Sequence, residues 1–223
     1  MRKVVLLCMS VLLLCALFGC TEKKQEDPVA NDQEKTEVSV PETEKTDHKI
    51  LVIYCSFVGE QYQVGVIDKG NTEILAKTIA QEIEADLFEV KPSDDHYPLT
   101  YQALTDVAKQ EQNDNARPEY LREGMPDLKE YDTIFIGAPV WWGDWPMMMY
   151  TFFEENLTQL NGKTLIPFST HGGSGLSGFD RKLGNVVKEA EILEGLAIAG
   201  VDCQNDPESV KDKVVSWLER IGY

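Results

Sequence analysis

Three short segments of the chain carry residues that could bind a ligand, and each follows a run of apolar residues. Ser56 and Phe57 follow the first run and precede Gly70, Asn71 and Thr72, which open a predicted helix. Hydroxyl groups and free N–H groups at the start of a helix can hold a phosphate group. The same residue types also serve as simple helix caps, with Asn71 as the candidate cap here. The segment matches neither common nucleotide-binding glycine motif, which disfavours ATP and NAD bound in those ways.

The second segment, residues 139–146, is rich in tryptophan. Trp141, Trp142 and Trp145 lie within five residues and are bounded by Pro139 and Pro146. Three indoles cannot all enter one core from a loop, so we expect them to stack against a flat ring. For any single tryptophan, packing over the end of a helix is the alternative interpretation.

The third segment, residues 169–175, consists of small and hydroxyl residues around one histidine. Its sequence is Ser169, Thr170, His171, Gly172, Gly173, Ser174 and Gly175. Such a loop lets the backbone approach a ligand and direct its N–H groups at carbonyl oxygens. His171 could titrate near neutral pH or form a local hydrogen bond. Together, the three segments predict a site for a flat heterocycle that carries a phosphate tail.

The segments lie between strands and helices that alternate along the chain. We expect strands at residues 49–55, 86–91, 133–138, 164–168 and 192–199, and helices at 72–84, 99–116, 147–157, 179–188 and 207–221. This alternation predicts an α/β fold with a doubly wound, five-stranded parallel sheet and helices on both faces. Ligands of such sheets bind beyond the carboxyl ends of the strands, which is where all three segments fall.

Charge and cysteine content exclude several classes of function. The chain has a net charge of −17, and residues 49–223 hold 15 Lys and Arg against 29 Asp and Glu, a net charge of −14. Such an acidic surface repels phosphate backbones, so we expect no nucleic-acid binding. The five cysteines form neither a disulfide scaffold nor a pattern typical of metal ligands.

The first 48 residues are expected to lie outside the folded domain. Residues 1–19 have a basic start and a short apolar run, as in a secretory signal. Residues 17–20 resemble the lipobox of bacterial lipoproteins, in which the cysteine, here Cys20, carries the lipid. A signal with an incidental cysteine is the alternative. Residues 20–48 hold few apolar side chains, so we expect an acidic, disordered tether and a domain at 49–223.

The domain sequence resembles the flavodoxin family, particularly its flavodoxin-like lipoproteins and small FMN oxidoreductases. The resemblance rests on Ser56 with Gly70-Asn71-Thr72, on residues 131–143, on residues 169–175, and on the shorter matches at 115–118 and 193–196. It implies a flavodoxin-like strand order of 2-1-3-4-5. In that order the first and fifth strands lie about 14 Å apart, beyond the reach of a disulfide, so Cys55 and Cys203 are expected to be thiols.

The resemblance also implies FMN as the cofactor and assigns residues to it. Ser56, Phe57, Asn71 and Thr72 would hold the phosphate; Pro139, Val140, Trp141, Trp142 and Gly143 would flank the ring; and Thr170, His171, Gly172, Gly173, Ser174 and Gly175 would bond its pyrimidine side. One departure from the short family loop is an insertion at 57–69. Tyr62 within it could cover the ring or lie on the surface.

The implied function is that of an FMN-binding electron-transfer flavodoxin, anchored by lipid outside the cytoplasmic membrane. Its partner would be a redox protein or a small acceptor, and the oligomeric state stays open. One alternative is an FMN-dependent NAD(P)H or quinone oxidoreductase, and another is a non-redox binding lipoprotein that has lost the cofactor. An acidic domain with only Lys163 between residues 139 and 178 predicts a low potential for formation of the fully reduced flavin.

Overall fold

The computed structural model describes residues 49–223, and the expected signal, Cys20 and tether lie outside the described residues. The main sheet consists of β1 (Ile50–Tyr54), β4 (Asp86–Glu89), β5 (Thr133–Pro139), β6 (Thr164–His171), β7 (Glu191–Ile192) and β8 (Leu196–Ala199). All pairings in this sheet are parallel, in the order β4-β1-β5-β6, with β7 and β8 both paired to β6. The flavodoxin-like order 2-1-3-4-5 is therefore confirmed, since β7 and β8 together take the fifth position.

The fifth strand differs from the prediction in its pairing with β6 beside Pro167, which lies within β6. Leu165 pairs with Ile192 and Phe168 pairs with Leu196, so one extra residue lies on the fifth strand between the two pairs. Proline has no N–H to donate to the ladder, and within sheets it is tolerated at such bulges. The predicted single strand at 192–199 was wrong, and the two short strands β7 and β8 take its place.

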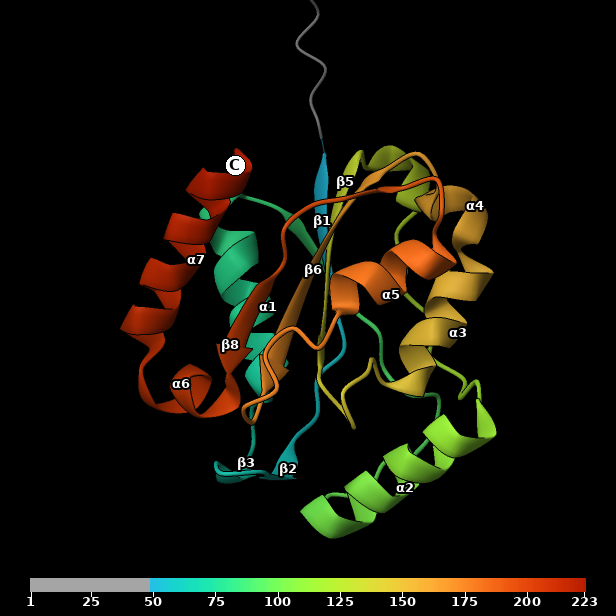
Figure 1. Ribbon diagram of the computed structural model, residues 1–223, viewed down its shortest axis with the longest axis vertical. Helices are drawn as coiled ribbons and strands as arrows, with labels where there is room; N and C mark the ends of the chain where they lie inside the picture. Colours follow the sequence, from blue (N-terminus) through green and yellow to red (C-terminus); the bar gives the residue numbers. More distant parts are fainter. Residues whose placement is uncertain (1–48) are drawn as a thin grey trace, which may run out of the picture. The chain divides into compact units, whose positions relative to one another are not determined.

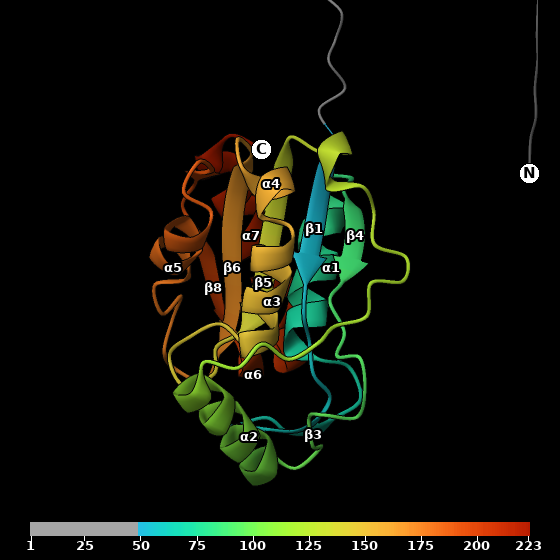
Figure 2. The same cartoon turned by 90° about the vertical axis from the view of Figure 1, so that its right-hand side faces the viewer.

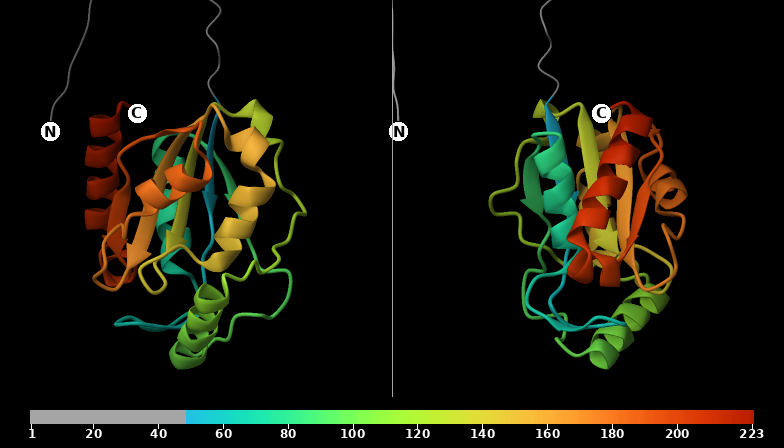
Figure 3. Two further views of the ribbon diagram at one scale, coloured as in Figure 1. Left: turned by 45° about the vertical axis from the view of Figure 1, so that its right-hand side comes forward. Right: turned by 90° about the vertical axis from the view of Figure 1, so that its left-hand side faces the viewer.

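Helices cover both faces of the sheet, as Figures 1 and 3 show. One face is covered by α1 (Asn71–Glu82), α6 (Gly200–Asn205) and α7 (Pro207–Ile221), and the other by α3 (Met147–Glu155), α4 (Leu157–Leu160) and α5 (Phe179–Val186). Alternate side chains of β1 serve the two layers: Leu51 and Ile53 pack in one hydrophobic core, and Val52 and Tyr54 in the other. Both faces of the strand are thus buried, as its uninterrupted apolar run predicts.

A small cap lies beyond the carboxyl ends of the strands. It consists of the hairpin β2 (Gly59–Gln61) and β3 (Gly65–Ile67) together with α2 (Tyr101–Asp114), which lies beside the hairpin rather than on a face of the sheet (Figures 1 and 2). The expectation of helices packed on the two faces was therefore wrong for α2. The insertion at 57–69 forms the hairpin. Below, we call the hairpin and α2 together the cap.

Several element boundaries also differ from the prediction. Ser169, Thr170 and His171 belong to β6, although the sequence placed them in the loop after it. The helix expected at 147–157 is divided at Asn156, whose side-chain amide donates to the carbonyl oxygen of Phe152 and to the hydroxyl of Tyr120. The remaining helix predictions are correct to within a few residues. A short 3-10 helix, η1 (Leu128–Glu130), precedes β5.

Cys55 and Cys203 are free and buried. They belong to the cores on opposite sides of the sheet, which keeps the two sulfur atoms apart. Burial raises the pKa of Cys203 to about 12 and that of Cys55 well above its ordinary value. Both thiols therefore stay protonated at neutral pH and behave as small apolar groups.

Candidate functional site

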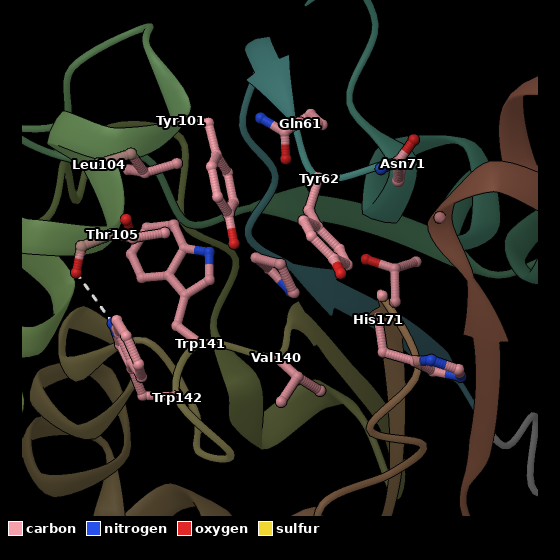
Figure 4. A pocket seen from close by; sticks show the side chains of 14 residues that line it. Gln61, Tyr62, Asn71, Tyr101, Leu104, Thr105, Val140, Trp141, Trp142 and His171 are labelled. Atoms are coloured by element: carbon pink, nitrogen blue, oxygen red, sulfur yellow. Dashed lines mark hydrogen bonds between the residues drawn. The ribbon is translucent and has the colours of Figure 1, made fainter. Parts of the chain in front are cut away.

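A cleft at the carboxyl edge of the sheet brings the three predicted segments together (Figure 4). The predicted site residues that line it are Asn71, Pro139, Val140, Trp141, Trp142, Thr170, His171 and Gly172. They come from the start of α1 and from the ends of β5 and β6 with the turns that follow. Parallel strands end at the same edge of a sheet, and this geometry assembles residues that are about 100 positions apart in sequence.

The first turn of α1 presents free hydrogen-bond donors beside the cleft. Gly70 is the cap residue, and it contributes no side chain. The N–H of Glu73 donates to the Oγ of Ser56 at 3.0 Å, whereas the N–H groups of Asn71 and Thr72 have no acceptor within residues 49–223. Free N–H groups at a helix N-terminus favour an anion, both by hydrogen bonding and through the helix dipole.

Asn71 is therefore not the N-cap that the sequence predicted. It is the first residue of α1, and its side-chain oxygen accepts a hydrogen bond of 2.8 Å from Gln204 on α6. A Cβ at Gly200 would lie 2.6 Å from the Nδ2 of Asn71, so a larger residue there would displace this amide. These contacts hold the Asn71 side chain at the wall of the cleft.

Gly70 also allows Ser56 to reach the helix. A Cβ at residue 70 would lie 2.1 Å from the Oγ of Ser56 and 2.9 Å from the carbonyl oxygen of Phe57. Ser56 itself does not line the cleft, but its Oγ meets the same helix end. Thr72 is buried just below, and its hydroxyl is hydrogen-bonded to that of Thr170.

Residues 141–144 form a tight turn that shapes the next wall. Trp141 and Asp144 exchange two backbone hydrogen bonds, of 3.0 and 2.9 Å, and the residues between them have positive φ angles of 49° at Trp142 and 73° at Gly143. Two positive φ angles are typical of a type I′ turn. The turn directs Trp142 toward α2, where its indole N–H donates to the carbonyl oxygen of Thr105 at 2.8 Å.

The three tryptophans have different environments, so the expectation that all would be available to a flat ring was wrong. Trp145 is 1% exposed and stacks on Phe179, with ring centroids 3.6 Å apart. Trp141 lines the cleft and is supported from behind by Phe57, whose ring centroid is 4.6 Å from its own. Phe57 thus supports the wall and does not itself line the cleft.

The third segment is held by hydrogen bonds within its own loop. The Nδ1 of His171 accepts from the N–H of Gly173 at 2.9 Å, and burial lowers the pKa of His171. A lowered pKa keeps the ring neutral at pH 7, as an accepting Nδ1 requires. The hydroxyl of Ser169 donates to the carbonyl oxygen of Gly175. Residues 173–175 and Gly143 do not line the cleft.

Six further residues line the cleft: Gln61, Tyr62, Tyr101, Leu104, Thr105 and Gly200. Of these, the sequence singled out only Tyr62, as a residue that could cover the ring or lie on the surface. All but Gly200 belong to the cap. The long insertion was the sequence signal that the hairpin could contribute to the site. No local sequence pattern indicated that α2 lies at this edge of the sheet. Gly200 could have been found, because it directly follows the fifth strand.

The comparisons with known proteins identify the family. A family model described as flavodoxin matches residues 49–221.

The chain belongs to the flavodoxin family.

Solved structures share the fold of this flavodoxin domain. A protein of Bacteroides eggerthii, assigned as a flavoprotein, has 26% identity over 78% of this chain and 98% of its own, with a TM-score of 0.61. A similarly assigned protein of Bacteroides uniformis has 27% identity over 77% and 98%, with a TM-score of 0.58. A flavoprotein of Lactobacillus acidophilus, solved in complex with FMN, has 23% identity over 73% and 99%, with a TM-score of 0.55. No curated protein matches the chain.

Two lysines approach the tryptophan turn of this flavodoxin site from neighbouring helices. The Nζ of Lys182, on α5, donates to the carbonyl oxygen of Gly143 and lies 3.2 Å from the carboxylate of Asp144. The Nζ of Lys109, on α2, lies 5.2 Å from the centre of the Trp142 ring. Both lysines lie outside residues 139–178, where the sequence shows only Lys163, so neither entered the prediction of a low potential.

Proposed function

We propose that this protein binds FMN in the cleft and transfers electrons, and that lipid on Cys20 holds it outside the cytoplasmic membrane. The observation that carries the proposal is the juxtaposition of free donors at the start of α1 with an aromatic wall at Trp141. One end of this cleft suits a phosphate and the other suits a flat ring, and FMN has both.

At the phosphate end, binding needs no cationic side chain. The N–H groups of Asn71 and Thr72 would donate to phosphate oxygens, and the hydroxyl of Ser56 lies at the same helix end. Backbone donors of this kind are fixed before the ligand arrives, so little ordering entropy is lost on binding.

At the ring end, the chain supplies an aromatic stacking surface. Trp141 and Tyr101 line this part of the cleft, as does Val140, which directly follows β5. Bound FMN supplies the redox chemistry, and the protein positions the ring and sets its electrostatic surroundings. The FMN complex of the Lactobacillus acidophilus protein shows that one protein of this fold holds that cofactor.

Charge favours a protein partner over a nicotinamide substrate. Among the described residues, those that line the cleft include no lysine or arginine that could hold the phosphate groups of NAD(P)H. The net charge of −14 on residues 49–223 is suited to steering a basic redox protein toward the site.

The test of the carrier function is electron transfer to a basic acceptor such as cytochrome c. The reduced holoprotein should reduce it at a rate that falls steeply as ionic strength rises, because salt screens the attraction. A rate that is slow and independent of salt would contradict the carrier function.

A second candidate is an FMN-dependent oxidoreductase that acts on quinones or similar flat acceptors. It is favoured by the extension of the cleft along α2, where Leu104 and Thr105 continue the wall past Trp141. Oxidation of NAD(P)H that depends on both the holoprotein and an added quinone would establish it. Retention of no flavin at all would instead favour the binding lipoprotein.

The membrane attachment rests on the N-terminal sequence. Within residues 49–223, the structure contains no helix with the length and apolar character needed to cross a bilayer. We infer attachment from the apolar run that ends at Cys20. Substitution Cys20→Ser should move the protein out of the membrane fraction, whereas Cys15→Ser, within the same run, should leave it there. Equal distribution of the two variants would contradict lipid attachment at Cys20.

A further inference from the structure

We propose that Tyr62 is a further residue of the cofactor site, which lies across the cleft and controls the entry and release of FMN. This inference rests on the proposed binding of FMN in that cleft. It concerns the insertion at 57–69, in which the sequence left two alternatives for Tyr62: that it covers the ring or that it lies on the surface.

Tyr62 lies at the tip of the β2–β3 hairpin. The turn is closed by a hydrogen bond of 3.2 Å from the N–H of Val64 to the carbonyl oxygen of Gln61, and Gln63 has a positive φ of 61°. The side chain of Tyr62 is 52% exposed.

The hairpin is attached to α2 at its base. The N–H of Glu60 donates to the carbonyl oxygen of Leu99 at 2.7 Å, and the carboxylate of Glu60 accepts from the N–H of Tyr101 at 3.0 Å. A carboxylate at a helix N-terminus is favoured by the helix dipole and replaces the missing side-chain cap of α2. A Cβ at Gly59 would lie 2.4 Å from the carbonyl oxygen of Leu99, so this junction requires glycine.

The ring of Tyr62 touches both walls of the cleft. On one side it stacks on Tyr101, with ring centroids 5.6 Å apart and an interplanar angle of 29°. On the other side it lies against the backbone of Gly172, where an added Cβ would be 2.5 Å from its Cδ1 atom. Tyr62 thus bridges the cap and the loop that follows β6.

The position of this bridge separates the two ends of the cleft. Figure 4 shows Tyr62 between Asn71, at the phosphate end, and Tyr101 with Trp141, at the ring end. A ligand that occupies both ends must pass the Tyr62 ring as it enters and as it leaves. Because the ring is half exposed and held by few contacts, it can move aside without disturbing either core.

The test is to measure the rates of FMN association and release with the full chain in detergent, by the fluorescence of free FMN. Tyr62→Ala should speed both association and release by about tenfold, a factor that corresponds to the loss of one aromatic contact. Tyr62→Phe should stay within about twofold of the wild type, because it keeps the ring. Val66→Ala is the matched control, since Val66 is 83% exposed on the same hairpin and lines no part of the cleft.

Gly172→Ala provides a second, independent variant. Its φ angle is not in the left-handed region, so alanine should displace the Tyr62 ring rather than strain the backbone. It should speed exchange in the wild-type background and have no further effect when combined with Tyr62→Ala. Rates unchanged in Tyr62→Ala, or release alone accelerated, would overturn the proposal. A wild-type chain that binds no FMN would instead refute the proposed function.

Discussion

The hydroxyl oxygens of Thr72 and Thr170 lie 2.7 Å apart, in a hydrogen bond that joins the first turn of α1 to the end of β6. The two residues are only 1% and 3% exposed. Thr72 lies at the phosphate end of the cleft, and Thr170 lines the cleft beside His171. This buried bond therefore fixes the two halves of the proposed cofactor site relative to each other.

Loss of both hydroxyls should cost less stability than the two single losses added together. Thr72→Val or Thr170→Val leaves the other hydroxyl buried without its partner, which should lower the free energy of unfolding by about 1–3 kcal/mol. The double variant should cost clearly less than the sum of the two, because no polar group is then left unpaired. Urea denaturation of the four proteins measures this coupling. Additive effects would show that the bond does not link the two segments.

The phosphate end can be tested with a ligand that lacks the phosphate. Ser56→Ala removes the Oγ that meets the N–H of Glu73 without the steric conflict that a side chain at Gly70 would cause. It should weaken FMN binding by about tenfold, the value of roughly one hydrogen bond to a charged group. Binding of riboflavin should be unchanged. Equal losses for the two ligands would place the effect of Ser56 outside the phosphate site.

The sequence predicted the sheet well because each strand is marked locally. The uninterrupted apolar run of β1 requires cover on both faces, and this requirement leads directly to a parallel sheet between helices. The break in the fifth strand could also have been foreseen, since Pro167 stands inside the strand that pairs with it.

The parts of the site that the sequence missed depend on distant contacts. The side chain of Trp145 is buried because it stacks on Phe179, 34 positions away. The position of α2 depends on the contact of Glu60 with the backbone of Tyr101, 41 positions away. Neither contact leaves a local pattern in composition or periodicity, so the wall formed by the cap became visible only in the structure.

A buried carboxylate on α2 should make the stability of the protein depend on pH. Glu111 on α2 is 6% exposed, and its carboxylate meets the ring of His96 at 2.5 Å and the hydroxyl of Tyr97 at 3.2 Å. Burial raises the pKa of Glu111 above its ordinary value of 4.5, although both hydrogen bonds oppose the shift. The folded state therefore holds this proton more tightly than the unfolded state does.

Consequently, the contribution of Glu111 to the free energy of unfolding should be largest below pH 4.5 and decline as the pH rises through the raised pKa. Glu111→Gln removes this titration while keeping hydrogen-bonding groups. The stability of the wild type relative to Glu111→Gln, measured by denaturation from pH 4 to pH 7, should fall with increasing pH. Parallel stability curves would exclude the burial effect.

The acidic domain should make the flavin hard to reduce. Reduction adds negative charge, which the net charge of −14 on residues 49–223 opposes. The potential for formation of the fully reduced flavin should therefore lie below that of free FMN. At the tryptophan turn, the positive charge of Lys182 partly offsets the negative charge of the domain, since Lys182 pairs with the carboxylate of Asp144. Lys182→Met should therefore lower the potential further, on the order of tens of millivolts, whereas the exposed Lys188→Met should change it less. A redox titration that gave the wild type a potential at or above that of free FMN would contradict this prediction.

The most direct test of the central claim is an absorption spectrum of the protein after incubation with FMN and exhaustive dialysis. Residues 49–223 suffice for it, because the whole sheet, both cores and the cleft lie within them. The structure predicts that the protein retains one FMN per chain, with bands shifted from those of free FMN by the aromatic surroundings. A dialysed protein without flavin bands would show that the donors at α1 and the aromatic wall do not form a cofactor site.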